Sequence, residues 1–318
     1  MCDILIETRD LKKYFNTSRG LLHAVDGVNL TINKGNTLGV VGESGCGKST
    51  LGRLVLRLLE PTEGKIYYDG QCISNYSRSK MDKMRTKMQI IFQDPNASLN
   101  PRMTISEIIA EPIKVCKTIR DSRERDKKVS ELMDTVGLAK RFINSYPHEM
   151  DGGRRQRIGV ARALALDPEF IVCDEPVSAL DVSIQAQILN LLMDLQDERR
   201  LSYMFVTHDL SVVKHISDEI MVMYLGQCVE RTSSDELFLN PIHPYTQALL
   251  AAIPVPDLIT ARNSKRITIR GEVTSPIDPK PGCRFSARCP YATEECTGED
   301  IMLKEVSPGH WVACTRCK

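Results

Sequence analysis

Apolar residues recur along the chain with two different spacings, and each spacing predicts one kind of element. Uninterrupted apolar runs at Thr37–Val41, Phe170–Cys173 and Tyr203–Thr207 are typical of buried strands. Between the last two runs, apolar residues return every three or four positions, as on one face of a helix: Ile184, Ile188, Leu191, Leu192 and Leu195. This strand–helix–strand order predicts an α/β fold with a parallel sheet.

Other parts of the chain predict further elements. Val25–Ile32 and Gly64–Tyr68 have strand-like sequences, and Asp69–Gly70 is a hairpin signal. Another short strand is predicted at Met88–Phe92, and residues 99–165 are predicted to be mainly helical. The first 75 residues therefore predict strands and turns, followed by a helical region.

The composition changes near residue 235, where proline, cysteine and loop-forming residues become frequent. We place a domain boundary there, with a first domain at 1–235 and a C-terminal extension at 236–318. The length of 318 residues suits about two domains. The 42 Lys and Arg residues nearly balance the 41 Asp and Glu residues, so the net charge of +1 does not indicate a nucleic-acid partner.

The N-terminus does not resemble a signal peptide, because residues 1–7 have neither a basic segment nor an apolar one. No apolar run approaches the roughly 20 residues that a membrane span needs. We therefore expect a soluble intracellular protein, which is compatible with docking on a membrane protein.

A glycine-rich segment follows the first buried run and fits the pattern G-x-x-x-x-G-K-[ST] of a phosphate-binding loop. It consists of Gly42, Glu43, Ser44, Gly45, Cys46, Gly47, Lys48, Ser49 and Thr50. Glycines let backbone N–H groups turn toward phosphate oxygens, and the following helix adds its positive end. Lys48 is expected to reach the β- and γ-phosphates, and the Ser49 hydroxyl to ligate Mg²⁺.

Two carboxylates end the second buried run. Asp174 would orient Mg²⁺ through a water, and Glu175 would act as the general base that polarises the attacking water. His208 lies after the next strand, where it would contact the γ-phosphate and the base. An acidic strand end that merely faces solvent is the alternative, and the phosphate loop in the same sheet favours catalysis.

Five of the 11 cysteines fall within the last 36 residues. In a reducing compartment such clustering indicates metal rather than disulfides. Four thiolates suit a [4Fe–4S] cluster or tetrahedral zinc, and free structural thiols are the third reading. The predicted ligands are Cys283, Cys289, Cys296 and Cys314, with Cys317 three residues further on. Hydrolysis of a nucleotide bound at the phosphate loop is expected largely to survive their loss, because the extension lies outside the nucleotide motifs.

From about residue 5 to 230 the chain resembles the nucleotide-binding subunit of an ABC transporter, because several motifs occur in the right order. The resemblance implies a phosphate-loop ATPase core with an antiparallel β subdomain and a helical subdomain at about 99–165. It implies that Tyr14 stacks on adenine and that Gln93 senses the γ-phosphate and Mg²⁺ and faces the membrane partner. It also places Asp181 in a loop at the dimer interface and makes His208 the switch histidine.

One motif departs from the family pattern L-S-G-G-Q. The chain has Met150, Asp151, Gly152, Gly153 and Arg154 at these positions. Gly152 and Gly153 keep the flexible approach to the nucleotide of a partner subunit, whereas a carboxylate replaces the serine hydroxyl. Asp151 either caps the helix, weakens the composite ATP site, or does both. A weakened site implies a heterodimer with a second ABC ATPase subunit.

The phosphate loop, residues 93–101, residues 243–246 and the sequence around Cys283 to Cys314 look like ATP-binding subunits of oligopeptide and dipeptide importers, closest to the F-type. This implies ATP and Mg²⁺ as cofactors, and two integral membrane permease subunits as partners. A separate extracytoplasmic peptide-binding protein would select the cargo, and the chain would lie peripherally on the cytoplasmic face of the membrane. Nickel import, phosphonate-degradation machinery and a soluble nucleic-acid ABC protein are the alternatives.

Overall fold

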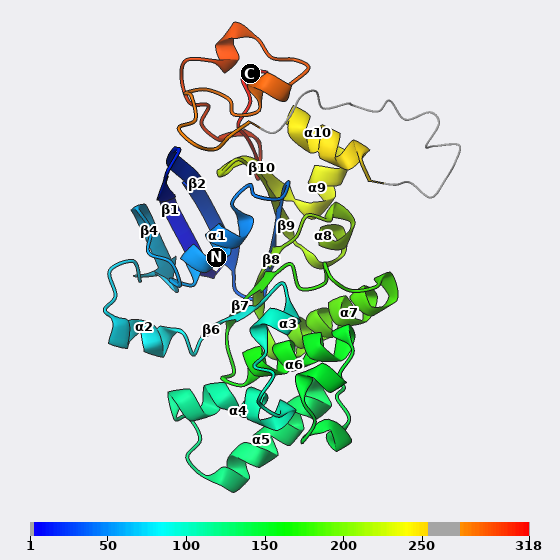
Figure 1. Cartoon of the computed structure of the whole chain (residues 1–318). Helices are drawn as coiled ribbons and strands as arrows, with labels where there is room; N and C mark the ends of the chain where they lie inside the picture. The colour runs from blue at the N-terminus through cyan, green and yellow to red at the C-terminus, as the bar shows by residue number, and fades with distance from the viewer. Residues whose placement is uncertain (1–2, 254–273, 318) are drawn as a thin grey trace, which may run out of the picture.

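Two β-sheets and a group of helices make up the described part of the chain, residues 3–253 and 274–317 of this computed structural model (Figure 1). The smaller sheet is antiparallel, with the strand order β2-β1-β4-β5. Its strands are β1 (Ile4–Thr17), β2 (Gly20–Asn33), β4 (Glu63–Tyr68) and β5 (Gln71–Cys72). The predicted hairpin at Asp69–Gly70 is confirmed, because both residues have the positive φ angles, 47° and 74°, that a tight turn requires.

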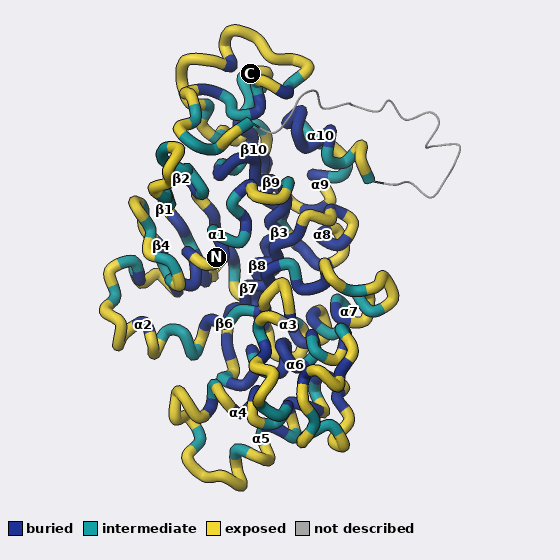
Figure 2. Tube along the Cα trace, in the orientation of Figure 1, coloured by how far each residue is buried: buried dark blue, intermediate teal, exposed yellow. Residues whose placement is uncertain are grey.

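The larger sheet has eight strands in the order β11-β12-β10-β9-β3-β8-β7-β6. The run from β9 to β6 is parallel, which confirms the predicted parallel sheet, and β10, β12 and β11 continue it in antiparallel fashion. Its strands are β3 (Thr37–Val41), β6 (Met88–Ile91), β7 (Phe170–Asp174), β8 (Ser202–Val206), β9 (Glu219–Tyr224), β10 (Gln227–Ser233), β11 (Lys304–Ser307) and β12 (His310–Val312). Every residue of β3, β7 and β8 is buried, as their apolar runs predict (Figure 2).

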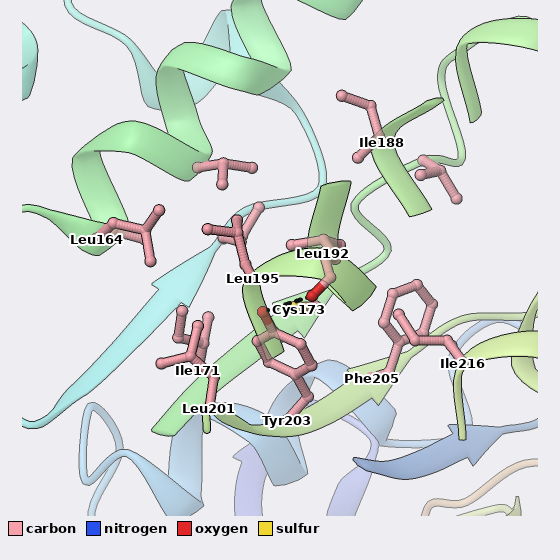
Figure 3. Close-up of a cluster of buried hydrophobic side chains, with 14 of the residues drawn as sticks. Leu164, Ile171, Cys173, Ile188, Leu192, Leu195, Leu201, Tyr203, Phe205 and Ile216 are labelled. Atoms are coloured by element: carbon pink, nitrogen blue, oxygen red, sulfur yellow. Dashed lines mark hydrogen bonds between the residues drawn. The ribbon is translucent and has the colours of Figure 1, made fainter. Parts of the chain in front are cut away.

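The larger sheet buries a core on each face, because successive strand residues point to opposite sides. Ile171 and Cys173 of β7 belong to one core, and Phe170 and Val172 belong to the other. The first core includes α6 (Gly152–Leu164), α7 (Val182–Arg199) and α8 (Leu210–Ile216), and there the Tyr203 hydroxyl donates to the Leu192 carbonyl at 3.0 Å (Figure 3). The second core joins α1 (Lys48–Val55) and the smaller sheet to the opposite face.

The predicted helical region at 99–165 is confirmed as a group of separate helices at one end of the molecule (Figure 1). Its helices are α4 (Ile105–Cys116), α5 (Ser122–Thr135) and α6, with short 3₁₀ turns between α5 and α6, and the short helix α3 (Pro95–Ser98) immediately precedes it. Thr104 and Glu107 form a capping box at the start of α4, in which each side chain accepts the backbone N–H of the other. The helix α2 (Arg78–Met84) connects β5 to β6.

The segment after residue 235 contributes strands β11 and β12 to the larger sheet. β12 pairs with β10, and the buried Glu230 carboxylate accepts hydrogen bonds from the His310 ring at 2.8 Å and from the backbone N–H of Ile242 and His243. Helices α9 (Ser234–Leu239) and α10 (Pro244–Ala251) follow β10. Among residues 3–253 and 274–317, no helix combines the length and apolar character needed to cross a membrane.

Candidate functional site

The glycine-rich segment forms a tight loop between β3 and the N-terminus of α1. Gly42 and Gly47 have φ angles of 151° and 104°. A Cβ atom would lie 2.2 Å from the Met223 carbonyl oxygen at Gly42 and 2.0 Å from the Ala24 carbonyl oxygen at Gly47. The loop thus needs glycine at both positions, for close approach and for positive φ. Gly47 is the N-cap of α1 and offers no side chain, so the helix start is open to an anion.

Lys48 is buried at the centre of this loop, with a relative exposure of 4%. Its ammonium group donates to the carbonyl oxygens of Gly42 at 2.7 Å and Glu43 at 3.0 Å. These contacts hold the positive charge over the loop and leave it paired with backbone dipoles rather than with a carboxylate. An incoming phosphate would therefore find an available cation at the helix start.

Ser49 and Asp174 meet directly, although 125 residues separate them. The Ser49 hydroxyl donates to the Asp174 carboxylate at 2.6 Å. Burial raises the pKa of the Asp174 carboxyl, and the hydrogen bond from Ser49 works against that rise. A hydroxyl beside a carboxylate suits Mg²⁺, which proteins usually hold by one or two such groups together with substrate phosphates. The residues therefore fit a magnesium ion that arrives with a nucleotide.

Glu175, Gln93 and His208 come together at the ends of β7, β6 and β8. The Gln93 amide donates to the Glu175 carboxylate at 2.8 Å, and the His208 Nδ1 atom lies 3.4 Å from the same oxygen. The Glu175 side chain is 12% exposed, and its backbone φ of 47° is unusual for a residue other than glycine. Backbone strain of this kind occurs at functional sites where the surrounding structure enforces it. Here the Glu175 N–H is fixed by a hydrogen bond to the Val206 carbonyl.

A cavity of about 250 Å³ lies over the loop, and six of the predicted loop residues line it together with Gln93 and Glu175. It is lined by Phe15, Leu22, Ala24, Ser44, Gly45, Gly47, Lys48, Ser49, Thr50, Gln93, Glu175 and Pro276. Gly42 and Cys46 are buried in the body of the loop instead.

Tyr14 does not line this cavity, and its predicted stacking on adenine stays a prediction. Its hydroxyl donates to Asp26, its ring stacks on His23 at 4.0 Å, and it lines a separate cavity of about 410 Å³. Phe15 is the aromatic residue that lines the loop cavity, because neighbouring residues of a strand point to opposite sides. The sequence analysis missed Phe15, and strand alternation read against the position of the loop would have been the signal for it.

Comparisons with known proteins agree with this geometry. The ABC transporter family model matches residues 25–178, and the model of the oligopeptide/dipeptide transporter C-terminal region matches residues 229–296. The chain is 52% identical to the oligopeptide transport ATP-binding protein AppF of Bacillus subtilis, over 98% of this chain and 97% of the relative. It is 50% identical to the dipeptide transport ATP-binding protein DppF of Haemophilus influenzae, over 98% and 96%.

The chain belongs to the ATP-binding subunits of oligopeptide and dipeptide ABC transporters. Two solved structures are also similar, each with a TM-score of 0.67. One is the ATP-binding cassette MJ0796 in a dimeric post-hydrolysis state bound to ADP and phosphate, at 29% identity over 72% of this chain and 99% of that one. The other is cbiO1 of Clostridium perfringens, at 27% identity over 75% and 92%. The family fold predicted from the sequence is thereby confirmed.

The altered signature of this ABC subunit lies at the start of α6. Asp151 is the N-cap: its carboxylate accepts the Arg154 N–H at 2.8 Å and pairs with the Arg154 guanidinium at 3.1 Å. A Cβ at Gly152 would lie 3.1 Å from Leu180, and one at Gly153 would lie 2.7 Å from Ile184. The two glycines thus allow α6 to approach the start of α7 closely.

Asp151, Gly152, Gly153 and Asp181 do not line the nucleotide cavity of their own chain. Asp181 is exposed at the N-cap of α7, and its side chain makes no capping hydrogen bond to that helix. The structure therefore separates the predicted site residues into a group around the phosphate loop and a group at the starts of α6 and α7.

The C-terminal cysteines Cys283, Cys289, Cys296 and Cys314 line one small cavity, and all are free thiols. Burial raises the pKa of the Cys283 thiol to about 11. Within residues 3–253 and 274–317, no three or more His, Cys, Asp or Glu side chains are placed to hold a metal ion. The predicted [4Fe–4S] cluster and the zinc alternative are therefore not supported by this structure.

Proposed function

We propose that this chain is the ATP-hydrolysing subunit that powers import of oligopeptides or dipeptides through an ABC transporter. The observation that carries the proposal is full-length similarity: relatives named as oligopeptide and dipeptide transport ATP-binding proteins match from end to end, including the C-terminal region. The site supports it, because a phosphate loop, a magnesium pair and a candidate base meet at one edge of a parallel sheet.

The chain's own residues have distinct roles in hydrolysis. The loop N–H groups and Lys48 bind the phosphates of ATP, and the Lys48 ammonium exchanges its two carbonyl partners for phosphate oxygens. Magnesium bound with ATP at Ser49 and Asp174 would neutralise phosphate charge. Glu175 accepts a proton from the attacking water, while Gln93 and His208 hold its carboxylate in place.

Phe15 supplies the base-binding surface in this proposal, in place of Tyr14. It lines the cavity together with Leu22 and Ala24 of the neighbouring strand β2. An aromatic face is suited to stacking on a nucleobase. Tyr14 instead helps to hold the β1–β2 hairpin through its hydrogen bond to Asp26.

The partners follow from the separation of the site residues into two groups. Asp151 and the two glycines are presented to a second ABC ATPase subunit, whose own phosphate loop they would meet. The two ATPase subunits would dock on two permease subunits at the cytoplasmic face of the membrane, and this chain would contact them through the surface near its Gln93. An extracytoplasmic binding protein would deliver the peptide.

The two ATP sites of this dimer would be unequal, because only one of them is completed by Asp151. In a homodimer of this chain both sites would carry Asp151, so its effect can be tested there. Asp151→Ser keeps an N-cap oxygen but removes a charge that opposes the γ-phosphate of the facing nucleotide. At about 5 Å and an effective dielectric near 20, one like-charge pair costs roughly 3 kcal/mol, and Arg154 at 3.1 Å offsets part of it. The homodimer should therefore hydrolyse ATP about tenfold faster at equal ATP occupancy.

Asp121→Ser is the matched control, because Asp121 caps α5 in the same way and accepts the Glu124 N–H at 3.0 Å. It should leave the ATPase rate unchanged. An Asp151→Ser homodimer that is no faster than wild type would show that the aspartate is only a cap, and the asymmetric dimer would be abandoned.

The cargo is tested by assembly and transport. The tagged full chain should co-purify with two integral membrane subunits and a second ATPase subunit. When this complex is reconstituted in liposomes, peptide together with its binding protein should increase the rate of ATP hydrolysis. Nickel serves as the competing probe. Stimulation by nickel and not by peptide, or absence of membrane partners, would refute the proposed peptide import.

A further inference from the structure

The first variable residue of the phosphate loop, Glu43, is held by the C-terminal extension. The Arg288 guanidinium donates to both carboxylate oxygens of Glu43, at 2.8 and 3.1 Å, across a sequence separation of 245 residues. The Arg288 side chain is 9% exposed and that of Glu43 is 28% exposed. A two-pronged arginine–carboxylate pair of this kind fixes orientation as well as distance.

A second group from beyond residue 235 holds the backbone of the same residue. The Tyr245 hydroxyl accepts the Glu43 N–H at 2.9 Å. Tyr245 is fully buried, and its ring packs against those of Tyr224 and Phe285, with centroids 4.7 and 5.3 Å away. Tyr224 in turn is within 3.3 Å of the Arg288 guanidinium. Side chain and backbone of Glu43 are thus fixed by one packed cluster.

The backbone carbonyl of Glu43 contacts Lys48, the side chain expected to bind phosphate. The carbonyl oxygen accepts the Lys48 ammonium at 3.0 Å. A continuous set of contacts therefore runs from Arg288 and Tyr245 through Glu43 to Lys48.

The extension also reaches the opposite side of the nucleotide cavity. Pro276 lines that cavity, and its carbonyl accepts the His23 N–H at 3.0 Å. Asp278 donates its N–H to the Leu21 carbonyl at 2.9 Å, and Arg284 donates to Asp26 on the same hairpin. Residues 276–288 thus contact both the β1–β2 hairpin and the phosphate loop.

We propose that the C-terminal extension is a working part of the ATP site, with Arg288 and Tyr245 as positioning residues that preform the phosphate loop through Glu43. The proposal rests only on ATP binding by this chain and not on the identity of the cargo. It reverses the expectation that ATPase activity is independent of the extension. Because Arg288 is next to Cys289, a change at the cysteine cavity that displaces this turn would also release Glu43.

The test is MgATP binding by calorimetry on the full-length chain, with thermal unfolding measured in parallel. Arg288→Ala should weaken MgATP affinity roughly tenfold or more, since a charged hydrogen-bonded pair is lost. Arg288→Lys should recover only part of the affinity, because one ammonium cannot reproduce the two-pronged contact. Lys304→Ala is the control: Lys304 lies in the same extension, is exposed on β11 and lines none of the cavities described, so this variant should bind MgATP as wild type does.

Tyr245→Phe and Tyr203→Phe separate positioning from general stability. Each change removes one buried hydroxyl with a single hydrogen-bond partner, Glu43 in one case and Leu192 in the other. Both should lower the unfolding temperature to a similar degree, but only Tyr245→Phe should weaken MgATP binding, by several-fold.

A double variant tests whether Glu43 and Arg288 act through one shared interaction. Glu43→Gln combined with Arg288→Ala should bind MgATP no worse than Arg288→Ala alone, because both changes break one interaction. Wild-type affinity in folded Arg288→Ala and Tyr245→Phe would overturn the proposal. So would an equal loss of affinity in Tyr203→Phe, or a double variant whose losses add. If Arg288→Ala does not fold, Arg288→Lys and Tyr245→Phe decide the question by the same criteria.

Discussion

Replacing Glu175 with glutamine is expected to lower ATP hydrolysis by the assembled transporter about a hundredfold or more while ATP still binds. Glutamine keeps the size of the side chain and an oxygen that can accept from Gln93, but it cannot take a proton from water. The phosphate contacts of Lys48 and the Ser49–Asp174 pair are untouched by the change. Single-turnover hydrolysis and nucleotide binding on the same sample measure the two effects separately.

Glu169→Gln is the matched control for this prediction. Glu169 immediately precedes the same strand, β7, but lies at its opposite end, where it pairs with Lys87 at 2.8 Å and accepts from the Tyr68 hydroxyl. The same chemical change there should leave the turnover rate at the wild-type value. Near-normal turnover of the Glu175→Gln transporter would mean that another group acts as the base or that the productive site is the partner's.

Replacing Gly47 with alanine is expected to abolish measurable MgATP binding. The added Cβ would lie 2.0 Å from the Ala24 carbonyl oxygen, and the φ of 104° is strained for any residue with a side chain. Overpacking and backbone strain together should lower the free energy of unfolding by about 2–6 kcal/mol. The loop can relieve the clash only by moving away from the phosphate position, so binding should fall about a hundredfold or more.

Gly45→Ala is the control for the stability part of this prediction. Gly45 belongs to the same loop and also has a positive φ, 78°, but a Cβ there would meet nothing within 4 Å. Its free energy of unfolding should fall by only about 1–2 kcal/mol. Equal losses of stability for the two variants in denaturant unfolding would show that the contact with Ala24 is not what makes Gly47 necessary.

Several parts of the site could be predicted because their chemistry is local in sequence. Six of the nine loop residues from Gly42 to Thr50 line one cavity, and Glu175 follows a strand that was predictable from its apolar run. Parallel strands share an edge, so residues that end β6, β7 and β8 meet there even though 115 positions separate Gln93 from His208.

The orientation of Tyr14 could not be predicted in the same way. A motif match fixes the strand but not which of two adjacent aromatic residues faces the loop, because one step along a strand reverses the side chain. The register of β1 against β2, with its bulges between Thr8 and Tyr14, sets that orientation. The cysteine spacing suggested metal ligands, but among the described residues no group of three or more His, Cys, Asp or Glu side chains is placed to hold a metal ion, so this prediction has no support.

The sequence by itself determined the order of strands and helices, the phosphate loop and the residues that end the central strands. Hydrophobic periodicity and glycine conformation act within a few residues. The short apolar runs of β3, β7 and β8 are typical of strands that are buried on both faces of a sheet. Only the tertiary structure decided that Phe15 faces the loop and that Arg288 and Tyr245 hold Glu43 across more than 200 positions. An arginine on a 3₁₀ turn carries no signal of its partner, since that pairing exists only once β10, β12 and α10 have packed together.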